Sequence, residues 1–175
     1  MLTRRHFLWA GGAAGAALVA APVEAAMTGV RDRSVFLHNA HTGETLRTTY
    51  WWGGRYDPSA LQRLNHLLRD HYSEKVHHMD PRLIDLLSKL QSNFGAHRPF
   101  EVFSAYRSPE TNAMLASCEE GVAAHSLHMQ GMAADIRLTG VGLRSLRYSA
   151  KSLRLGGVGS YRSFVHVDVG RVRYW

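Results

Sequence analysis

The chain has 175 residues and a mass of 19.6 kDa, with 45% hydrophobic and 20% charged residues. This length suits one compact domain, and the composition excludes an intrinsically disordered or polytopic membrane protein. Lys and Arg outnumber Asp and Glu by 21 to 14, which predicts an anionic partner such as nucleic acid, a membrane surface or an acidic polymer. The single cysteine excludes an internal disulfide, and the 11 histidines make imidazole the expected metal ligand.

An export signal is predicted at the amino terminus. Arg4 and Arg5 precede an apolar run rich in Gly and Ala, residues 10–21, as is typical of twin-arginine signals. Small residues favour cleavage after Ala25, so residues 1–25 are predicted to be a signal peptide. The alternative is an uncleaved anchor helix, which the short, glycine-containing run disfavours. Export to the periplasm makes peptidoglycan and surface polymers the expected anionic partners, with no nucleic acid bound and no stable membrane span after processing.

The mature chain is expected to form one compact α+β domain. It begins with a hairpin segment, residues 26–56, in which the strand-like runs 34–38 and 45–50 flank a turn. Residues 57–175 are expected to form the remainder of the domain and to carry its chemistry.

Three helices are predicted by a polar cap that precedes a proline at the first helical position. These pairs are Asp57-Pro58, Asp80-Pro81 and Ser108-Pro109. A fourth helix, residues 143–155, has an apolar face and a basic stripe, although such stripes are usually ordinary solvated surface. Strands are expected at 100–105, 133–138, 157–161, 164–169 and 171–175. We therefore expect a small antiparallel sheet packed against helices.

A possible metal site follows from the spacing of three residues. His128 and Asp135 are separated by a glycine that can turn the chain, and residues 164–169 alternate so that His166 and Asp168 share one face, directed into a cleft. Two imidazoles and one carboxylate form the ligand set of catalytic zinc sites, which leave a fourth position for water. An isolated His or Asp of this kind is commonly structural, but the three together favour a metal site.

These residues resemble a family of zinc peptidases that includes D-alanyl-D-alanine carboxypeptidases, murein endopeptidases and the hedgehog signalling domain. The matching motifs are Ser126-x-His128-x-x-Gly131-x-Ala133-x-Asp135, the later His166, and the segment Tyr106-Arg107-Ser108-Pro109. The resemblance is strongest to the murein endopeptidase K subgroup, and it extends over nearly the whole mature chain.

The resemblance implies that residues 57–175 form a zinc peptidase domain whose sheet carries one zinc ion, bound by His128, Asp135 and His166. It implies further that Arg107 and Ser126 bind substrate, and the Ser126 hydroxyl is also expected to support the ligand loop. The implied reaction is hydrolysis of a peptide bond in a peptidoglycan stem peptide or in a D,D- or L,D-type crosslink, during cell wall remodelling.

The expected general base is missing from its usual place. Several members of the family carry Glu, Asp or His three residues before the last ligand, where this chain has Ser163. We predict that Asp168 is the catalytic base, with orientation of His166 or Arg107 as the alternative role. His125 is a further candidate. The absence of a base at Ser163 also leaves open a second function, a zinc-containing protein that binds peptidoglycan without cleaving it.

Overall fold

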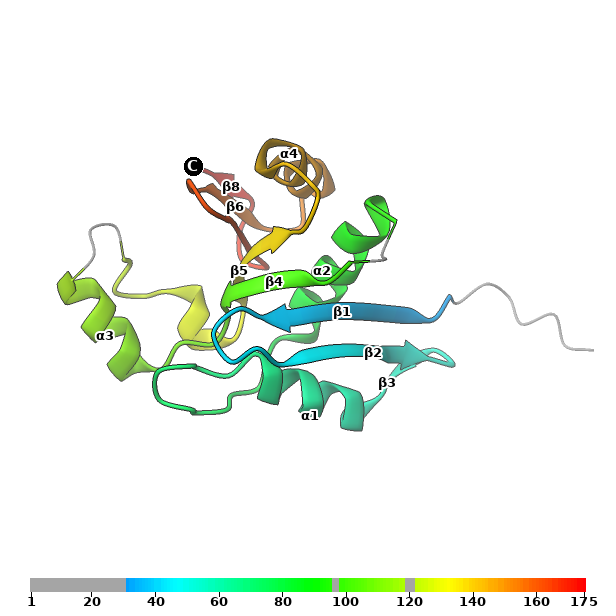
Figure 1. Ribbon diagram of the computed structural model, residues 1–175, viewed down its shortest axis with the longest axis horizontal. Coiled ribbons are helices and arrows are strands. Elements are labelled where there is room, and N and C mark those ends of the chain that lie inside the picture. The colour runs from blue at the N-terminus through cyan, green and yellow to red at the C-terminus, as the bar shows by residue number, and fades with distance from the viewer. Residues whose placement is uncertain (1–30, 96–97, 119–121) are drawn as a thin grey trace, which may run out of the picture.

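The computed structural model describes residues 31–95, 98–118 and 122–175 (Figure 1). The predicted signal peptide, residues 1–25, lies outside these residues. Of the helices that are described, none combines the length and the apolar character needed to cross a membrane.

The predicted hairpin is present at the start of the described chain. Strands β1 (Arg33–Asn39) and β2 (Thr45–Trp52) pair in antiparallel fashion, and the short β3 (Arg55–Tyr56) extends the pairing. The connecting turn contains Gly43 at a φ of +75°, a conformation that favours glycine. The hairpin belongs to the same sheet as the later strands, because β1 also pairs with β4.

The capped prolines begin helices as predicted. The described residues form four α-helices: α1 (Pro58–Leu67), α2 (Pro81–Asn93), α3 (Pro109–Cys118) and α4 (Leu143–Leu153). The Asp57 carboxylate accepts hydrogen bonds from backbone N–H groups in the first turn of α1, and Asp80 does the same for α2. Helix α2 ends just before Gly95, which has a φ of +84°.

The sheet differs from the prediction. The remaining strands are β4 (Phe100–Ser104), β5 (Ala133–Leu138), β6 (Gly157–Ser160), β7 (Val165–Asp168) and β8 (Arg173–Tyr174). Within the described residues the sheet has eight strands in the order β3-β2-β1-β4-β5-β7-β6-β8, so the prediction of a small antiparallel sheet is wrong. The sheet is mixed, because β1 pairs with β4, and β6 with β8, in parallel. Helices α1 and α2 lie between β2 and β4 in the chain and form the crossover that returns β4 parallel to β1.

The helices cover the sheet and bury one continuous core, which confirms the α+β class. Helix α1 packs on β2, α2 on β1, and α4 on β5, β6 and β7. Leu64 of α1, Leu87 of α2 and Phe100 of β4 are fully buried at these contacts. The central strands β4, β5 and β7 are therefore fixed by neighbours in the sheet and by the core. Of these, β5 carries Asp135 and β7 carries His166.

Candidate metal centre

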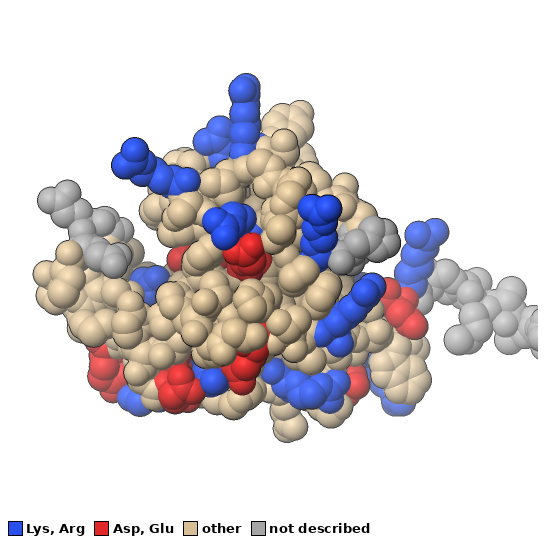
Figure 2. Space-filling view, in the orientation of Figure 1, with Lys and Arg blue, Asp and Glu red and all other residues tan. Residues whose placement is uncertain are grey.

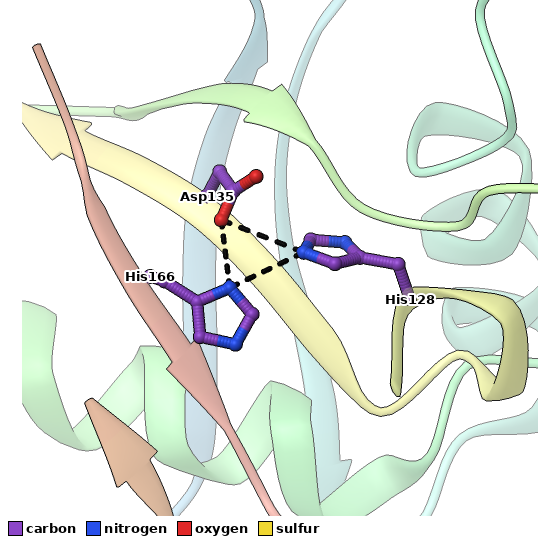
Figure 3. Close-up of side chains that lie close together, drawn as sticks. All are labelled: His128, Asp135 and His166. Atoms are coloured by element: carbon purple, nitrogen blue, oxygen red, sulfur yellow. Dashed lines mark hydrogen bonds and ion pairs between the residues drawn. The ribbon is translucent and has the colours of Figure 1, made fainter. Parts of the chain in front are cut away.

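Three predicted ligands converge at the middle of the sheet (Figure 3). Asp135 of β5 and His166 of β7 are paired directly across the two antiparallel strands, so their side chains leave the same face. His128 approaches from a 3₁₀ turn, Leu127–Gln130, that precedes β5. In the parts of the chain that the structure describes, no other group of His, Cys, Asp or Glu comes together in this way.

The turn that carries His128 is fixed by its two ends. The Ser126 hydroxyl caps the turn and accepts a hydrogen bond from the His128 N–H at 3.3 Å. Gly131 ends the turn at a φ of +66°, and a Cβ there would lie only 2.5 Å from the His78 carbonyl oxygen. The Asp80 N–H donates to the Gly131 carbonyl at 2.9 Å, which ties the turn to the start of α2. A glycine is therefore required within the ligand spacing.

The three ligand atoms surround one point. The distance from His166 Nδ1 to Asp135 Oδ1 is 2.8 Å, and His128 Nε2 lies 3.2 Å from His166 Nδ1 and 3.5 Å from Asp135 Oδ1. All three residues are buried. Two nitrogens and one oxygen grouped so closely form a donor set suited to zinc.

The outer partners of both imidazoles direct a lone pair to that point. His128 Nδ1–H donates to the Ala105 carbonyl at 2.7 Å, which leaves Nε2 unprotonated. His166 Nε2–H donates to Asp168 Oδ2 at 3.3 Å, so in the neutral ring that a metal would bind, Nδ1 is the nitrogen without a proton. A metal ion needs this pair of tautomers, and the residues around the site supply both.

The buried ionisable groups of the site shift one another's pKa values. Burial favours the neutral form of Asp135, but His128 and His166 outweigh it and lower the pKa of that carboxyl well below its usual range. Burial likewise opposes protonation of His166, yet hydrogen bonds to Asp135 and Asp168 raise its pKa above the ordinary value. The carboxylate of Asp135 is therefore ionised at neutral pH and available as a ligand.

Asp168 lies behind His166 and is completely buried. Its Oδ1 accepts hydrogen bonds from the N–H groups of Gly157 at 2.9 Å and Gly170 at 2.8 Å, and its Oδ2 accepts one from Arg173 Nη2 at 2.8 Å. Burial raises the pKa, but these hydrogen bonds and that of His166 prevail and lower the pKa of Asp168 to about 2. Both faces of β7 are covered, so the expected cleft does not reach Asp168.

Arg107 borders the site, and several N–H donors of its guanidinium group have no close hydrogen-bond partner in the described parts of the chain. Its Nη2 is 3.3 Å from Ser104 Oγ and 3.9 Å from Asp135 Oδ2, and its Nη1 is 3.5 Å from Asn112 Oδ1. The Nε atom is buried and has no hydrogen-bond partner among the described residues. These contacts are long for charged groups, so the guanidinium retains donors for an incoming anion.

The position of Arg107 depends on a residue that the sequence did not reveal. Asp70 is buried, and its Oδ2 accepts a hydrogen bond at 2.9 Å from the N–H of Ser108, the neighbour of Arg107. Burial raises the pKa of Asp70, but hydrogen bonds from Thr111 and Ser108 lower it below its usual range. Asp70 and Ser108 are far apart in the chain, and a lone Asp after an apolar helix carries no pattern that would identify this contact.

An aromatic side chain forms another wall of the site. The Trp175 ring lies 5.3 Å from the His166 ring and is covered on another side by the Arg173 guanidinium, 4.9 Å from its centroid. A Cβ on Gly159 would lie 2.7 Å from the indole, so glycine allows the ring to rest on β6. No role was predicted for Trp175; its alternation with Arg173 on the predicted last strand, residues 171–175, is the signal that places both on one face.

The other residues singled out from the sequence differ in burial. Ser126 is buried and its hydroxyl caps the ligand turn, as the sequence indicated for its supporting role. His125, the further candidate for the base, is exposed, and so is Ser163.

Comparison with known proteins agrees with this geometry. Residues 27–175 match the family profile Peptidase_M15_2, described as "Peptidoglycan L,D-endopeptidase MepK". A protein of Escherichia coli K12 with that name is 40% identical over 175 residues, which cover 98% of this chain and 96% of that protein. A protein of Haemophilus influenzae, named "Probable peptidoglycan L,D-endopeptidase MepK", is 39% identical over 176 residues, which cover 98% of this chain and 95% of the relative.

The family match spans the hairpin, the ligand turn and all strands that carry the His, Asp and His cluster. It confirms the resemblance that the motifs around His128 and His166 indicated, and its members are hydrolytic peptidases of the metal-dependent type. This chain therefore belongs to the Peptidase_M15_2 family, the family of peptidoglycan L,D-endopeptidase MepK.

Proposed function

We propose that this protein is a zinc-dependent peptidase that hydrolyses L,D-type peptide bonds in peptidoglycan crosslinks during cell wall remodelling. The observation that carries the proposal is the buried cluster of His128, Asp135 and His166, whose outer hydrogen bonds leave the lone pairs that a metal needs. The L,D specificity is supported by the names of relatives that match nearly the whole chain.

Each residue of the site has a distinct task in this proposal. When bound, one zinc ion per chain supplies a Lewis acid and increases the acidity of a water molecule. The guanidinium of Arg107 binds a substrate carboxylate or the oxygen that becomes negative as the amide is attacked. Ser126 fixes the ligand turn at the edge of the substrate site, and Trp175 shields one side of His166 from water.

Of the two roles predicted for Asp168, the geometry favours orientation. A base must reach the water that attacks the substrate, whereas the Asp168 carboxylate faces Nε2 of His166 and the ligand atoms cluster around Nδ1. We propose that Asp168 holds the His166 tautomer and that proton transfer belongs to a group on the open side of the site.

The cellular location follows from the substrate. We propose that residues 1–25 direct twin-arginine export to the periplasm and are removed there. The expected product is a periplasmic chain that begins at Ala26. Replacement of Arg4 and Arg5 by Lys should abolish its appearance in the periplasm, and unchanged export of that variant would contradict the twin-arginine route.

The decisive test is digestion of purified peptidoglycan. The zinc-loaded protein should release new muropeptides from sacculi that contain L,D crosslinks, EDTA should stop the release, and added zinc should restore it. Liquid chromatography with mass spectrometry identifies which bond is cut. Binding of zinc and sacculi without any product would favour the alternative, a non-catalytic peptidoglycan-binding protein.

The same assay tests Arg107. Arg107→Ala should lower kcat/KM about tenfold to hundredfold while zinc remains bound, because a charge-assisted contact contributes about 1.5–3 kcal/mol. Arg107→Lys is the matched control; it keeps the charge and should recover part of the rate. Loss of zinc from Arg107→Ala would show that the residue supports the metal centre.

A further inference from the structure

The outer face of α4 carries a row of cations. We call this row the α4 stripe; its residues are Arg144, Arg147, Lys151 and Arg154. Arg144, Arg147 and Lys151 recur every three or four residues along one side of α4, and Arg154 follows as the C-cap of the helix. Leu146 and Ala150, on the adjoining side, are buried in the core. Tyr148 is 77% exposed on the outer side, and α4 contains no acidic residue.

The α4 stripe presents positive charge that no carboxylate among the described residues neutralises. Across residues 31–95, 98–118 and 122–175, none of its four members has a carboxylate within ion-pair distance. Other cations such as Arg33, Arg69 and Arg82 do form such pairs. Figure 2 shows blue side chains and no red ones at the top of the molecule, where Figure 1 places α4.

A chain of contacts through Ser160 and Trp175 links the α4 stripe to the metal centre. Arg147 Nη1 donates to Ser160 Oγ at 2.9 Å, and Lys151 lies 5.0 Å from the Tyr174 ring. Ser160 N–H donates at 2.9 Å to the carbonyl of Trp175, whose ring lies 5.3 Å from that of His166. A polymer that lies along α4 therefore passes onto the elements that wall the metal centre.

We propose that the α4 stripe is a docking surface for the carboxylate-bearing strands of intact peptidoglycan. This inference rests on the proposed function, because the polymer it binds is the proposed substrate. A single exposed ion pair contributes little, but repeated carboxylates along a strand engage several cations together and raise the local concentration of crosslinks at the site. An anionic membrane fits less well, because the apolar face of α4 is buried against the sheet and is unavailable to lipid.

The proposal is tested with two variants of equal charge. The stripe variant combines R144Q, K151Q and R154Q, and it leaves Arg147 because of its contact with Ser160. The control variant combines R47Q, R55Q and R63Q, three exposed cations on β2, β3 and α1 at the opposite edge of the sheet. Cosedimentation with purified sacculi in the cold should show about tenfold weaker binding for the stripe variant and binding like that of wild type for the control. Wild-type binding should weaken as salt is added.

Activity on two substrates separates docking from chemistry. Both variants should hydrolyse a small soluble crosslinked muropeptide at the wild-type rate, while the stripe variant digests intact sacculi about tenfold more slowly. If both variants lose sacculus binding equally, the loss is due to net charge alone and the proposal is overturned. Unchanged binding by the stripe variant would also overturn it. Stripe-dependent binding to anionic lipid vesicles, without binding to sacculi, would assign the surface to the membrane instead. Stripe-dependent sacculus binding without hydrolysis of either substrate would leave docking intact and contradict the peptidase function.

Discussion

Substitution of His128 by alanine should remove the bound zinc and lower peptidoglycan hydrolysis about a thousandfold. In the proposed site His128 supplies one of three ligand atoms, and its ring is held by the Ala105 carbonyl with Nε2 directed at the other two. A metal ion contributes several kcal/mol to stabilisation of the transition state, and about 4 kcal/mol corresponds to a factor of a thousand in rate.

Metal content and rate should be measured on the same preparation of His128→Ala. His38→Ala is a suitable control, because the His38 side chain, on β1, forms a hydrogen bond with the Thr45 hydroxyl away from the metal centre. Circular dichroism of both variants checks that the fold persists. Full zinc occupancy in His128→Ala would remove His128 from the ligand set.

Asp168→Asn should weaken zinc binding about tenfold to hundredfold, the cost typical of losing a partner behind a metal ligand. The amide nitrogen of an asparagine in this place can donate to His166 Nε2, which moves the imidazole proton to Nδ1, the atom that faces the other ligands. The change also leaves Arg173 without its buried carboxylate, so we expect the free energy of unfolding to fall by about 3 kcal/mol.

Zinc titration and denaturant unfolding of Asp168→Asn measure these two effects. Excess zinc should restore most of the activity if Asp168 only orients His166. If zinc binds normally but the rate falls about a hundredfold or more, Asp168 is the base that the sequence predicted. Arg173→Gln is the control, because it weakens the ion pair but leaves the Asp168 carboxylate to accept from His166.

The sequence predicted those features that depend on neighbouring residues. Capping by Asp57 and Asp80 is a contact within one helical turn, and the alternation through residues 164–169 is a property of one strand, so both were read correctly. The candidate ligands His128 and Asp135 also stand in one short motif, and the turn at Gly131 brings them together.

Features that depend on distant segments were not predicted. The parallel pairing of β1 with β4 depends on where two helices return the chain, which no local pattern encodes. Alternation showed that His166 and Asp168 share a face, but it could not show that Gly157, Gly170 and Arg173 would enclose Asp168. The hydrogen bond from Ser108 to the buried Asp70 likewise joins residues far apart in the chain, so no local pattern predicted it.

The direct pairing of Asp135 with His166 across β5 and β7 has a consequence for the folding of this protein. A slip of one residue between these strands would move one proposed ligand to the other face of the sheet, so a zinc ion bound as proposed would recognise the native register alone. The two strands are joined through α4 and β6, and contacts between such distant segments form late. We therefore expect zinc to act as a kinetic stabiliser, one that slows unfolding and leaves the rate of folding nearly unchanged.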